Sequence, residues 1–165
     1  MLIVVTGVSG TGKTTVGSGI ANSLNLPFFD ADNFHPKENI EKMSKGVPLN
    51  DVDRLPWLQS LAELLTDHEK SGGAVLACSA LKESYREILK GNNNVQWIHL
   101  KGDKELIWRR MLARKNHYMK ADMLDSQFAT WEEPQYGLKL NILHTPEEML
   151  SQALRYLGVA EGSRG

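Results

Sequence analysis

The chain has little of several features that would point to a location or a partner. It holds one cysteine among 165 residues, Cys78, so an internal disulfide framework is excluded. The apolar run that opens the chain is too short for a secretory signal, and no later run reaches membrane-spanning length. Charge is nearly balanced, with 19 basic and 20 acidic residues, which does not favour binding to nucleic acid or to a membrane surface. These absences predict a cytoplasmic protein with a small-molecule ligand.

The residues that are present suit one compact α/β domain over 1–165. An apolar content of 41% is enough for a substantial core. Short apolar runs alternate with helical patterns, which is typical of a parallel sheet covered by helices. Because the segment before the third strand is too long for a simple crossover, we expect a helical substrate-binding insertion at about 33–71. The expected strands are residues 2–5, 26–29, 74–78, 95–100 and 138–143.

A final helix is predicted after the fifth strand. Thr145 and Glu148 have the spacing of a capping box, in which each side chain accepts a backbone N–H of the other residue. Pro146 then takes the first helical position, where its missing N–H costs nothing. The helix is therefore expected to begin at Pro146.

The first expected strand leads directly into a glycine-rich loop. Its pattern, GxxxxGK[ST], is that of loops that bind nucleotide phosphates. Backbone N–H groups can wrap a polyphosphate closely only where glycines leave room, and the start of the following helix favours anionic oxygens. In this pattern Lys13 reaches the β- and γ-phosphates, and the Thr14 hydroxyl ligates Mg²⁺. The loop thus predicts a nucleoside triphosphate site made by Gly7, Val8, Ser9, Gly10, Thr11, Gly12, Lys13 and Thr14.

Two aspartates follow the second expected strand. In an open parallel sheet, ligands bind beyond the carboxyl ends of the strands, so Asp30 and Asp32 are expected beside the glycine-rich loop. One carboxylate could hold the water shell of the metal while the other accepts a proton from an attacking hydroxyl. The alternative is a turn that is rich in aspartate and has no chemical role.

Polar residues after the aspartates are candidates for contact with a second substrate. His35 could hydrogen-bond a hydroxylated substrate, or it could cap a helix that starts at Pro36. Arg54, in a polar loop, is the best candidate to grip a carboxylate, because a guanidinium pairs bidentately with planar anions. A surface ion pair of Arg54 with Asp51 or Asp53 is the alternative.

The third expected strand ends in another loop that faces the same edge of the sheet. Small residues there admit a ligand, and Ser79 or Lys82 could bond to it. Cys78, at the end of the strand, is more typical of a buried strand residue than of a nucleophile.

The one notable concentration of charge is a basic segment that consists of Arg109, Arg110, Arg114, Lys115, His117 and Lys120. Arg110 and Arg114 are four residues apart and therefore share one helix face. A mobile lid at about 115–133 that closes over the phosphates would neutralise transition-state charge and exclude water. A solvated helix face is the alternative. RNA binding is disfavoured, because no aromatic platform accompanies the charge.

These motifs together resemble the gluconate kinases, a small P-loop family related to shikimate kinase and the nucleoside monophosphate kinases. The resemblance runs from Val4 to about Pro134. It implies a P-loop NTPase fold with sheet order 2-3-1-4-5, ATP and Mg²⁺ as cofactors, transfer to the 6-hydroxyl of D-gluconate, and commonly a homodimer. The stretches that carry it are GVSGTGKTT, DADNFHPKENIEKMSKGVPLNDVDRLPWL, CSALKESYREIL and LARKNHYMKADMLDSQFATWEEP.

The resemblance also implies roles for individual residues. Thr15 extends the nucleotide loop, and Asp32 matches the second carboxylate of the related kinases' DxD motif, the usual candidate base. Arg110 matches the arginine that lies by the adenine, and Arg114 matches the arginine that reaches the phosphates. Pro146 falls in the loop that covers the other side of the adenine.

The resulting hypothesis is in-line phosphoryl transfer from MgATP to a sugar-acid hydroxyl. Mg²⁺ would be held by Thr14 and, through water, by Asp30, while Arg54 grips the gluconate carboxylate. A kinase of a shikimate-like acid or of a nucleoside monophosphate is the nearest alternative, and the HP and LNDVDR stretches argue against it. A GTPase-like switch would need an NKxD motif, which the sequence lacks. A nucleotide-dependent binding module without chemistry is the third alternative.

Overall fold

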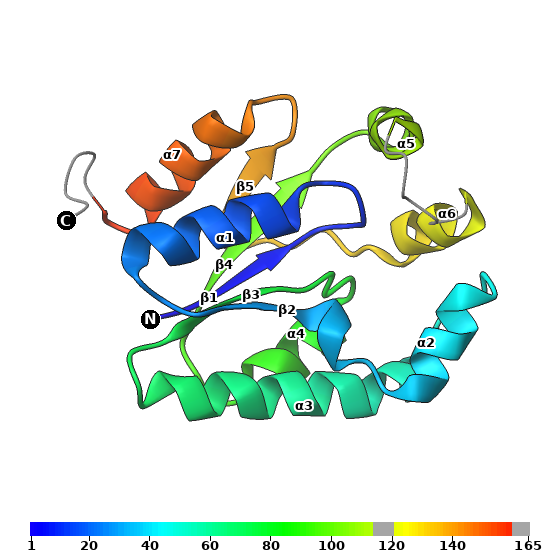
Figure 1. The fold of residues 1–165 in the computed structure, drawn as a ribbon, viewed down its shortest axis with the longest axis horizontal. Helices are drawn as coiled ribbons and strands as arrows, with labels where there is room; N and C mark the ends of the chain where they lie inside the picture. Colours follow the sequence, from blue (N-terminus) through cyan, green and yellow to red (C-terminus); the bar gives the residue numbers. More distant parts are fainter. Residues whose placement is uncertain (114–120, 160–165) are drawn as a thin grey trace.

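The computed structural model describes residues 1–113 and 121–159. Within them, five parallel strands form one sheet in the order β2-β3-β1-β4-β5 (Figure 1). This order is the one that the family resemblance implies, so that prediction is confirmed. The strands are β1 Leu2–Thr6, β2 Phe28–Asp30, β3 Ala74–Ala77, β4 Val95–Lys101 and β5 Leu138–Asn141. The helices are α1 Lys13–Leu24, the 3₁₀ helix η1 Ala31–Phe34, α2 Lys37–Ser44, α3 Asp51–Glu69, α4 Glu83–Lys90, α5 Lys104–Leu112, α6 Ala121–Thr130 and α7 Pro146–Tyr156.

Strand β1 lies in the middle of the sheet because its side chains suit burial on both faces. All five of its residues are buried, and it pairs with β3 on one side and β4 on the other. Since the strands are parallel, their carboxyl ends meet at one edge, where Thr6, Asp30 and Lys101 end β1, β2 and β4. This edge collects the loops that carry the candidate site.

Helices cover both faces of the sheet. Helices α1 and α7 pack together on one face, and α3 and α4 pack together on the other (Figure 1). Trp57, Leu58, Leu61 and Leu65 give α3 its buried face. Helices α2, α5 and α6 gather beyond the carboxyl end of the sheet (Figure 1). No helix in the described ranges has the length and apolar character needed to span a bilayer.

Helix α3 begins earlier than the sequence pattern predicts. The polar stretch before Pro56 was predicted to be a loop, but the helix starts at Asp51. Asn50 and Asp53 form a capping box: the Asn50 side chain accepts the Asp53 N–H at 2.8 Å, and the Asp53 carboxylate accepts the Asn50 N–H at 3.0 Å. Arg54 therefore projects from the first helical turn, which fixes its backbone more firmly than a loop would.

Helix α7 begins where the sequence predicts. Thr145 and Glu148 form the expected capping box, and Pro146 is the first helical residue. Strand β2, by contrast, begins two residues later than expected and includes Asp30, so this aspartate ends the strand instead of following it.

Candidate active site

The glycine-rich loop between β1 and α1 is packed against α5. Gly10 has a φ of 83°, and a Cβ at this position would lie 2.9 Å from Cγ2 of Ile107 and 3.0 Å from Cγ of Met111. Both the backbone angle and the close contact exclude a larger residue. Inside the loop, the buried Thr11 hydroxyl donates to the Val8 carbonyl at 2.8 Å. Contacts within the protein thus define the shape of the loop.

Lys13 folds back over this loop. Its Nζ donates to the Gly7 carbonyl at 2.9 Å and to the Val8 carbonyl at 3.1 Å. Burial lowers the pKa of Lys13, and the nearby charge of Asp32 opposes that effect. The ammonium therefore lies between the loop and the acidic end of β2.

Asp30 and Asp32 lie beside the loop, as the sequence predicts. The Thr14 Oγ1 lies 3.5 Å from Oδ2 of Asp30, and Oδ1 of Asp30 accepts the Asp32 N–H at 3.0 Å. Desolvation in the cleft raises the pKa of Asp32, and Lys13 lowers it. Because the Asp32 side chain is 82% exposed, solvent limits the upward shift. This carboxylate is therefore accessible to a ligand.

The imidazole of His35 is buried at the floor of the cleft. Its ring stacks on Trp57, with centroids 4.2 Å apart and planes 15° apart, and Nε2 lies 3.9 Å from Oδ1 of Asp32. Burial, followed by the charge of Arg54, lowers the pKa of His35 to about 4, so the ring is neutral at pH 7. His35 does not cap α2, whose N-cap is Pro36. The ring is instead available to a ligand.

Arg54 makes no ion pair with Asp51 or Asp53, so the alternative role, a surface ion pair with one of them, is excluded. Asp53 pairs with Lys42 at 2.8 Å, and Asp51 accepts a hydrogen bond from the Tyr85 hydroxyl. Arg54 Nη1 donates to that same hydroxyl at 2.9 Å, and its guanidinium lies over the Tyr85 ring. No carboxylate in the described ranges lies within ion-pair distance of Arg54, so its charge faces the cleft without a direct counterion.

The two candidates after β3 have different surroundings. Ser79 lines the cleft with Lys13 and Asp32. Lys82 instead pairs with Asp51 at 3.1 Å and lies outside the cavity lining, at the edge of the cluster around Tyr85. Cys78 is buried as predicted, and burial raises its pKa to about 12, so it is not a nucleophile at neutral pH.

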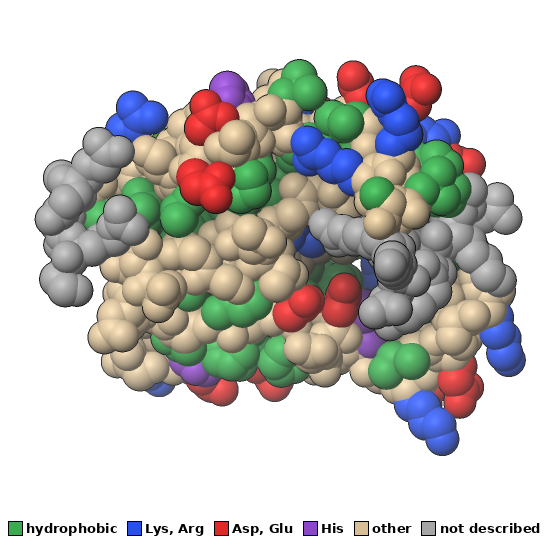
Figure 2. All heavy atoms as spheres, turned by 45° about the horizontal axis from the view of Figure 1, so that its top comes forward, with side chains coloured by type: hydrophobic (Ala, Val, Ile, Leu, Met, Phe, Trp, Pro, Cys, Tyr) green, Lys and Arg blue, Asp and Glu red, His purple; other side chains and the backbone are tan. Residues whose placement is uncertain are grey.

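One cavity brings residues of the glycine-rich loop together with the candidates for acceptor binding: Ser9 and Lys13 line it with Asp32, His35, Arg54 and Ser79. It lies between the glycine-rich loop, η1, the start of α3 and α6. Figure 2 shows acidic side chains at the margin of a hollow near the centre of the molecular surface in that view. Polar groups make up much of its wall, which suits a hydroxylated ligand better than an apolar one. The residues that line it are Ser9, Lys13, Asp32, His35, Met43, Pro48, Leu49, Arg54, Trp57, Ser79, Leu81, Met123, Ser126 and Gln127.

The arginine predicted beside the adenine reaches the loop after β5. Arg110 Nη2 donates to the Ile142 carbonyl at 2.8 Å, which brings α5 next to the turn that leads to Pro146. The adenine roles of Arg110 and Pro146 stay predictions. Arg114 lies outside the described residues.

Comparison with known proteins decides the family. The sequence model of the shikimate kinase family matches residues 9–138. The thermoresistant gluconokinase of Escherichia coli K12 is 47% identical over 135 residues, which cover 81% of this chain and 77% of the relative. A gluconokinase structure from Sinorhizobium meliloti 1021 superposes with a TM-score of 0.87 at 38% identity, covering 95% of this chain and 91% of that one. A sugar kinase structure from Janibacter sp. HTCC2649 gives a TM-score of 0.90 at 44% identity, covering 96% and 94%.

The chain belongs to the gluconokinase family. The matched family model and these structures also confirm the P-loop kinase fold that the glycine-rich loop predicts. Use of ATP follows from membership in this group of P-loop kinases.

In this gluconokinase-family chain, Gln127 is a site residue that sequence reasoning missed. Its Oε1 accepts the backbone N–H of Ser9 at 2.7 Å, and its Nε2 donates to the Ser9 hydroxyl at 3.0 Å. The two residues are 118 positions apart, so no local pattern could have joined them. This pair holds α6 against the phosphate-binding loop.

Arg86 is a second missed residue. It is 1% exposed and donates to the carbonyls of Ala80 at 2.9 Å, Leu81 at 3.2 Å and Glu132 at 2.6 Å. The guanidinium also lies over the Trp131 ring, 4.9 Å from its centroid. Arg86 thus joins the loop after β3, which borders the cavity, to the segment that follows α6.

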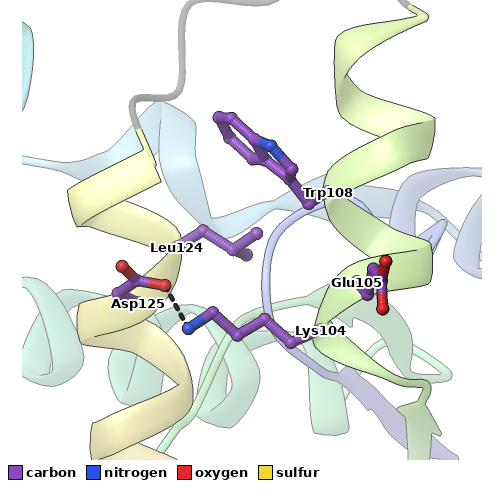
Figure 3. A pocket seen from close by; sticks show the side chains of 5 residues that line it. All are labelled: Lys104, Glu105, Trp108, Leu124 and Asp125. Atoms are coloured by element: carbon purple, nitrogen blue, oxygen red, sulfur yellow. Dashed lines mark ion pairs between the residues drawn. The ribbon is translucent and has the colours of Figure 1, made fainter.

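A second, mostly apolar pocket lies between α5 and α6. Trp108 of α5 and Leu124 of α6 lie on either side of it, and Lys104 pairs with Asp125 across the same gap (Figure 3). Glu105 lies on the α5 side of the pocket. None of the predicted site residues lines this pocket, so it is separate from the cavity at the phosphate-binding loop.

Proposed function

We propose that the protein transfers the γ-phosphoryl group of ATP to the 6-hydroxyl of D-gluconate. Relatives named gluconokinase, such as the Escherichia coli K12 protein at 47% identity, support this substrate. The observation that carries the proposal is the single cavity that Ser9 and Lys13 of the loop line together with Asp32, His35 and Arg54. A phosphate site and a carboxylate beside one cavity are what in-line phosphoryl transfer requires.

On the donor side, the loop N–H groups and Lys13 stabilise charge on the transferred group. Asp32 accepts the hydrogen bond of the 6-hydroxyl and takes its proton as the oxygen bonds to the γ-phosphorus. The bond from that phosphorus to the leaving oxygen of ADP breaks in the same step. The exposed carboxylate of Asp32, beside the Lys13 ammonium, supports this assignment. Arg114 is proposed to add positive charge at the phosphates.

On the acceptor side, Arg54 binds the gluconate carboxylate. Its lack of a direct counterion in the described ranges supports this role, because a cation held by Tyr85 and facing the cavity is completed by an anionic ligand. His35 and Ser79 are proposed to hydrogen-bond hydroxyl groups of gluconate. Lys82 is proposed to act at the edge of the site, where it pairs with Asp51.

The oxygen groups beside the loop fit Mg²⁺. The Thr14 hydroxyl and the Asp30 carboxylate lie 3.5 Å apart, and such hard oxygen ligands suit this ion. The described residues hold no cluster of three or more His, Cys, Asp or Glu side chains that could hold a metal ion, so the proposed site also needs oxygens of the nucleotide and of water. We propose that Thr14 binds the ion directly and Asp30 through water. When bound, Mg²⁺ neutralises charge on the β- and γ-phosphates.

A coupled assay of ADP release tests the proposed substrate. The protein is given ATP with gluconate, related sugar acids, shikimate or nucleoside monophosphates in separate reactions. We expect stoichiometric ATP consumption with gluconate and a much lower kcat/KM with the others, because an acceptor without a matching carboxylate and hydroxyl leaves buried polar groups unpaired. Turnover only with shikimate or a nucleotide would contradict the proposal, as would ATP binding without consumption.

Three wider features remain proposals. A homodimer is expected from the family resemblance, and light scattering tests it, because the dimer has twice the 18.5 kDa of one chain. We also propose that the insertion at about 33–71 binds the acceptor and that a lid at about 115–133 closes over the site. Part of the lid lies outside the described residues. A cytoplasmic location is proposed as well.

A further inference from the structure

Asn39, on α2, is a buried polar residue that none of the proposed catalytic steps uses. It is 2% exposed, and its side chain lies between the backbone of α3 and the His35 ring. Its Nδ2 is 2.9 Å from the carbonyl oxygen of Asp53 and 3.2 Å from Nδ1 of His35. A buried amide with two such partners has its hydrogen-bonding role fixed by what those partners can do.

The Asp53 carbonyl decides which way the Asn39 amide points. A backbone carbonyl oxygen can only accept, so the Asn39 atom beside it is the NH₂ nitrogen. The same nitrogen has a second hydrogen to donate to Nδ1 of His35. Nδ1 therefore accepts, and the single hydrogen of the neutral imidazole is on Nε2.

The position of the ring is fixed as well as its tautomer. Trp57 stacks on it, and the Trp57 Nε1–H is itself held by the Ala31 carbonyl at 2.7 Å. The charged groups that face the ring are Asp32 of η1 and Arg54 of α3, and burial together with Arg54 keeps the ring neutral by lowering its pKa to about 4. The Nε2–H is thus a fixed, uncharged donor beside the Asp32 carboxylate.

The separation of His35 Nε2 from Asp32 Oδ1 suits one shared hydroxyl group. At 3.9 Å the two atoms are too far apart for a direct hydrogen bond. One oxygen at an ordinary hydrogen-bond distance of about 2.8 Å from each can bridge them. Such a hydroxyl would accept from Nε2–H, donate to Asp32, and keep a lone pair for the phosphorus.

We propose that Asn39 is a positioning residue that holds His35 as the Nε2–H tautomer, so that His35 and Asp32 together orient the acceptor hydroxyl. The proposal rests on the function proposed above and adds a residue that acts on the substrate only through His35. An analogous arrangement, in which a second residue fixes a histidine tautomer, is common where histidines bind metals or substrates.

The tautomer is measured first, by the ¹⁵N chemical shifts of His35 in the full chain without nucleotide or acceptor. We expect a neutral ring with the hydrogen on Nε2. A ring with its hydrogen on Nδ1 would overturn the proposal even in an active kinase. An enzyme that fails to phosphorylate gluconate but shows the Nε2–H ring would overturn the proposed substrate and leave the tautomer assignment standing.

Kinetics of Asn39→Asp then test the positioning role. A carboxylate beside Nδ1 accepts from it, so we expect the hydrogen to move to Nδ1 and kcat/KM for gluconate to fall roughly tenfold or more, as for the loss of one hydrogen bond. The matched control is Asn22→Asp, which makes the same change at an exposed position on α1. It should stay within about twofold of the parent, because an exposed charge is well solvated.

The His35→Gln background separates positioning from a general structural role. A glutamine can present an N–H where Nε2–H was, and it has no tautomer for Asn39 to fix. The Asn39→Asp effect should therefore shrink in this background, and an equal loss in both backgrounds would overturn the proposal. If Asn39→Asp does not fold by circular dichroism, His35→Gln is compared with His35→Asn, which reaches only the Nδ1 position. Higher kcat/KM for the glutamine variant supports the proposal, and the reverse overturns it.

Discussion

Side chains in the cleft are oriented by partners that are far away in the sequence. The Tyr85 hydroxyl accepts from Arg54, 31 residues earlier, and donates to Asp51. It thereby bridges the Arg54 guanidinium to the Asp51 carboxylate and fixes the position of both. At the scale of single residues, some side chains, such as Arg54, therefore present their charge to the cavity, and others, such as Tyr85, hold them in position.

Replacing Lys13 tests the donor side of the site. Lys13→Ala removes the only side-chain ammonium among the described residues that line the cavity, so charge on the γ-phosphoryl group is less well stabilised in the transition state. We expect kcat to fall by roughly 100-fold or more at saturating substrates, measured by ADP release. Lys70→Ala, at an exposed lysine after α3, should retain parental turnover. Wild-type turnover in Lys13→Ala would remove the basis for the phosphate-loop assignment.

Replacing Arg54 tests the acceptor side. Arg54→Ala should raise the KM for gluconate by roughly 10- to 100-fold, the range expected for lost hydrogen bonds between charged groups, and leave the KM for ATP nearly unchanged. The control is Arg155→Ala, at an exposed position on α7. An unchanged KM for gluconate in Arg54→Ala would show that the carboxylate binds elsewhere.

Local patterns predicted some of these residues and not others. Lys13 and Thr14 belong to a contiguous motif, and Asp30 follows an apolar run whose carboxyl end is expected at the ligand-binding edge of the sheet, so local patterns predicted them. Asn39 and Gln127 could not be found in this way. Each is an ordinary polar residue on a helix, and its role arises only when the fold brings it against His35 or Ser9.

Among the elements, α6 is tied to the phosphate-binding loop by hydrogen bonds. Gln127 of α6 hydrogen-bonds both the backbone N–H and the side-chain hydroxyl of Ser9. Asp125, also on α6, pairs with Lys104 of α5. The two contacts differ in exposure. The Lys104 and Asp125 side chains are each 53% exposed, whereas the Gln127 contact is partly buried.

Removing the Gln127 contact should loosen α6. In Gln127→Leu the Ser9 N–H loses its partner, so we expect the free energy of unfolding to fall by about 1–2 kcal/mol and amide hydrogen exchange across α6 to accelerate. Urea denaturation and hydrogen-exchange mass spectrometry measure the two effects.

The matched control for that variant is Lys104→Met, which breaks the other tether of α6. Because this ion pair is exposed, the expected change in unfolding free energy is below about 1 kcal/mol. A larger effect from Lys104→Met than from Gln127→Leu would contradict the ranking of the two contacts.

At the level of elements, the sheet could be predicted more fully than the helix starts. All five strands were expected close to their observed positions, the first four from apolar runs and β5 from a weaker pattern that Lys139 and Asn141 interrupt. The start of α3 was missed because its capping box uses Asp53 at the third helical position, where the usual pattern has glutamate or glutamine.

At the scale of the whole molecule, two histidines in the described part of the chain are buried in the neutral form. His99, which is 1% exposed and contacts the Thr6 hydroxyl at 2.6 Å, has its pKa lowered to about 4 by burial and then by Arg86. His35 has the same shift, from burial and then Arg54. In the unfolded chain both rings would titrate near 6.5.

Stability should consequently depend on pH. Between pH 6.5 and pH 4 the unfolded chain binds more protons than the folded one, so the unfolding free energy is highest above pH 6.5 and falls as pH drops toward 4. Each ring contributes on the order of 3 kcal/mol over this window. Urea denaturation at several pH values measures the slope.

The slope can be assigned with two variants. His99→Gln should reduce the loss of stability between pH 6.5 and 4, since one titrating ring is gone. Asn22→Gln, an exposed change on α1 that neither adds nor removes a titrating group, should leave it unchanged. An unaltered slope in His99→Gln would mean that other groups govern the acid response.

The guanidinium of Arg86 has a consequence for attempts to redesign this enzyme. It satisfies carbonyls from two segments that are about fifty positions apart along the chain, those of Ala80 and Leu81 and that of Glu132. A loop grafted from another kinase in place of either segment would leave this cation facing carbonyls of the wrong geometry. Exchanges meant to alter substrate choice should therefore transplant both segments together with residue 86 as one cassette.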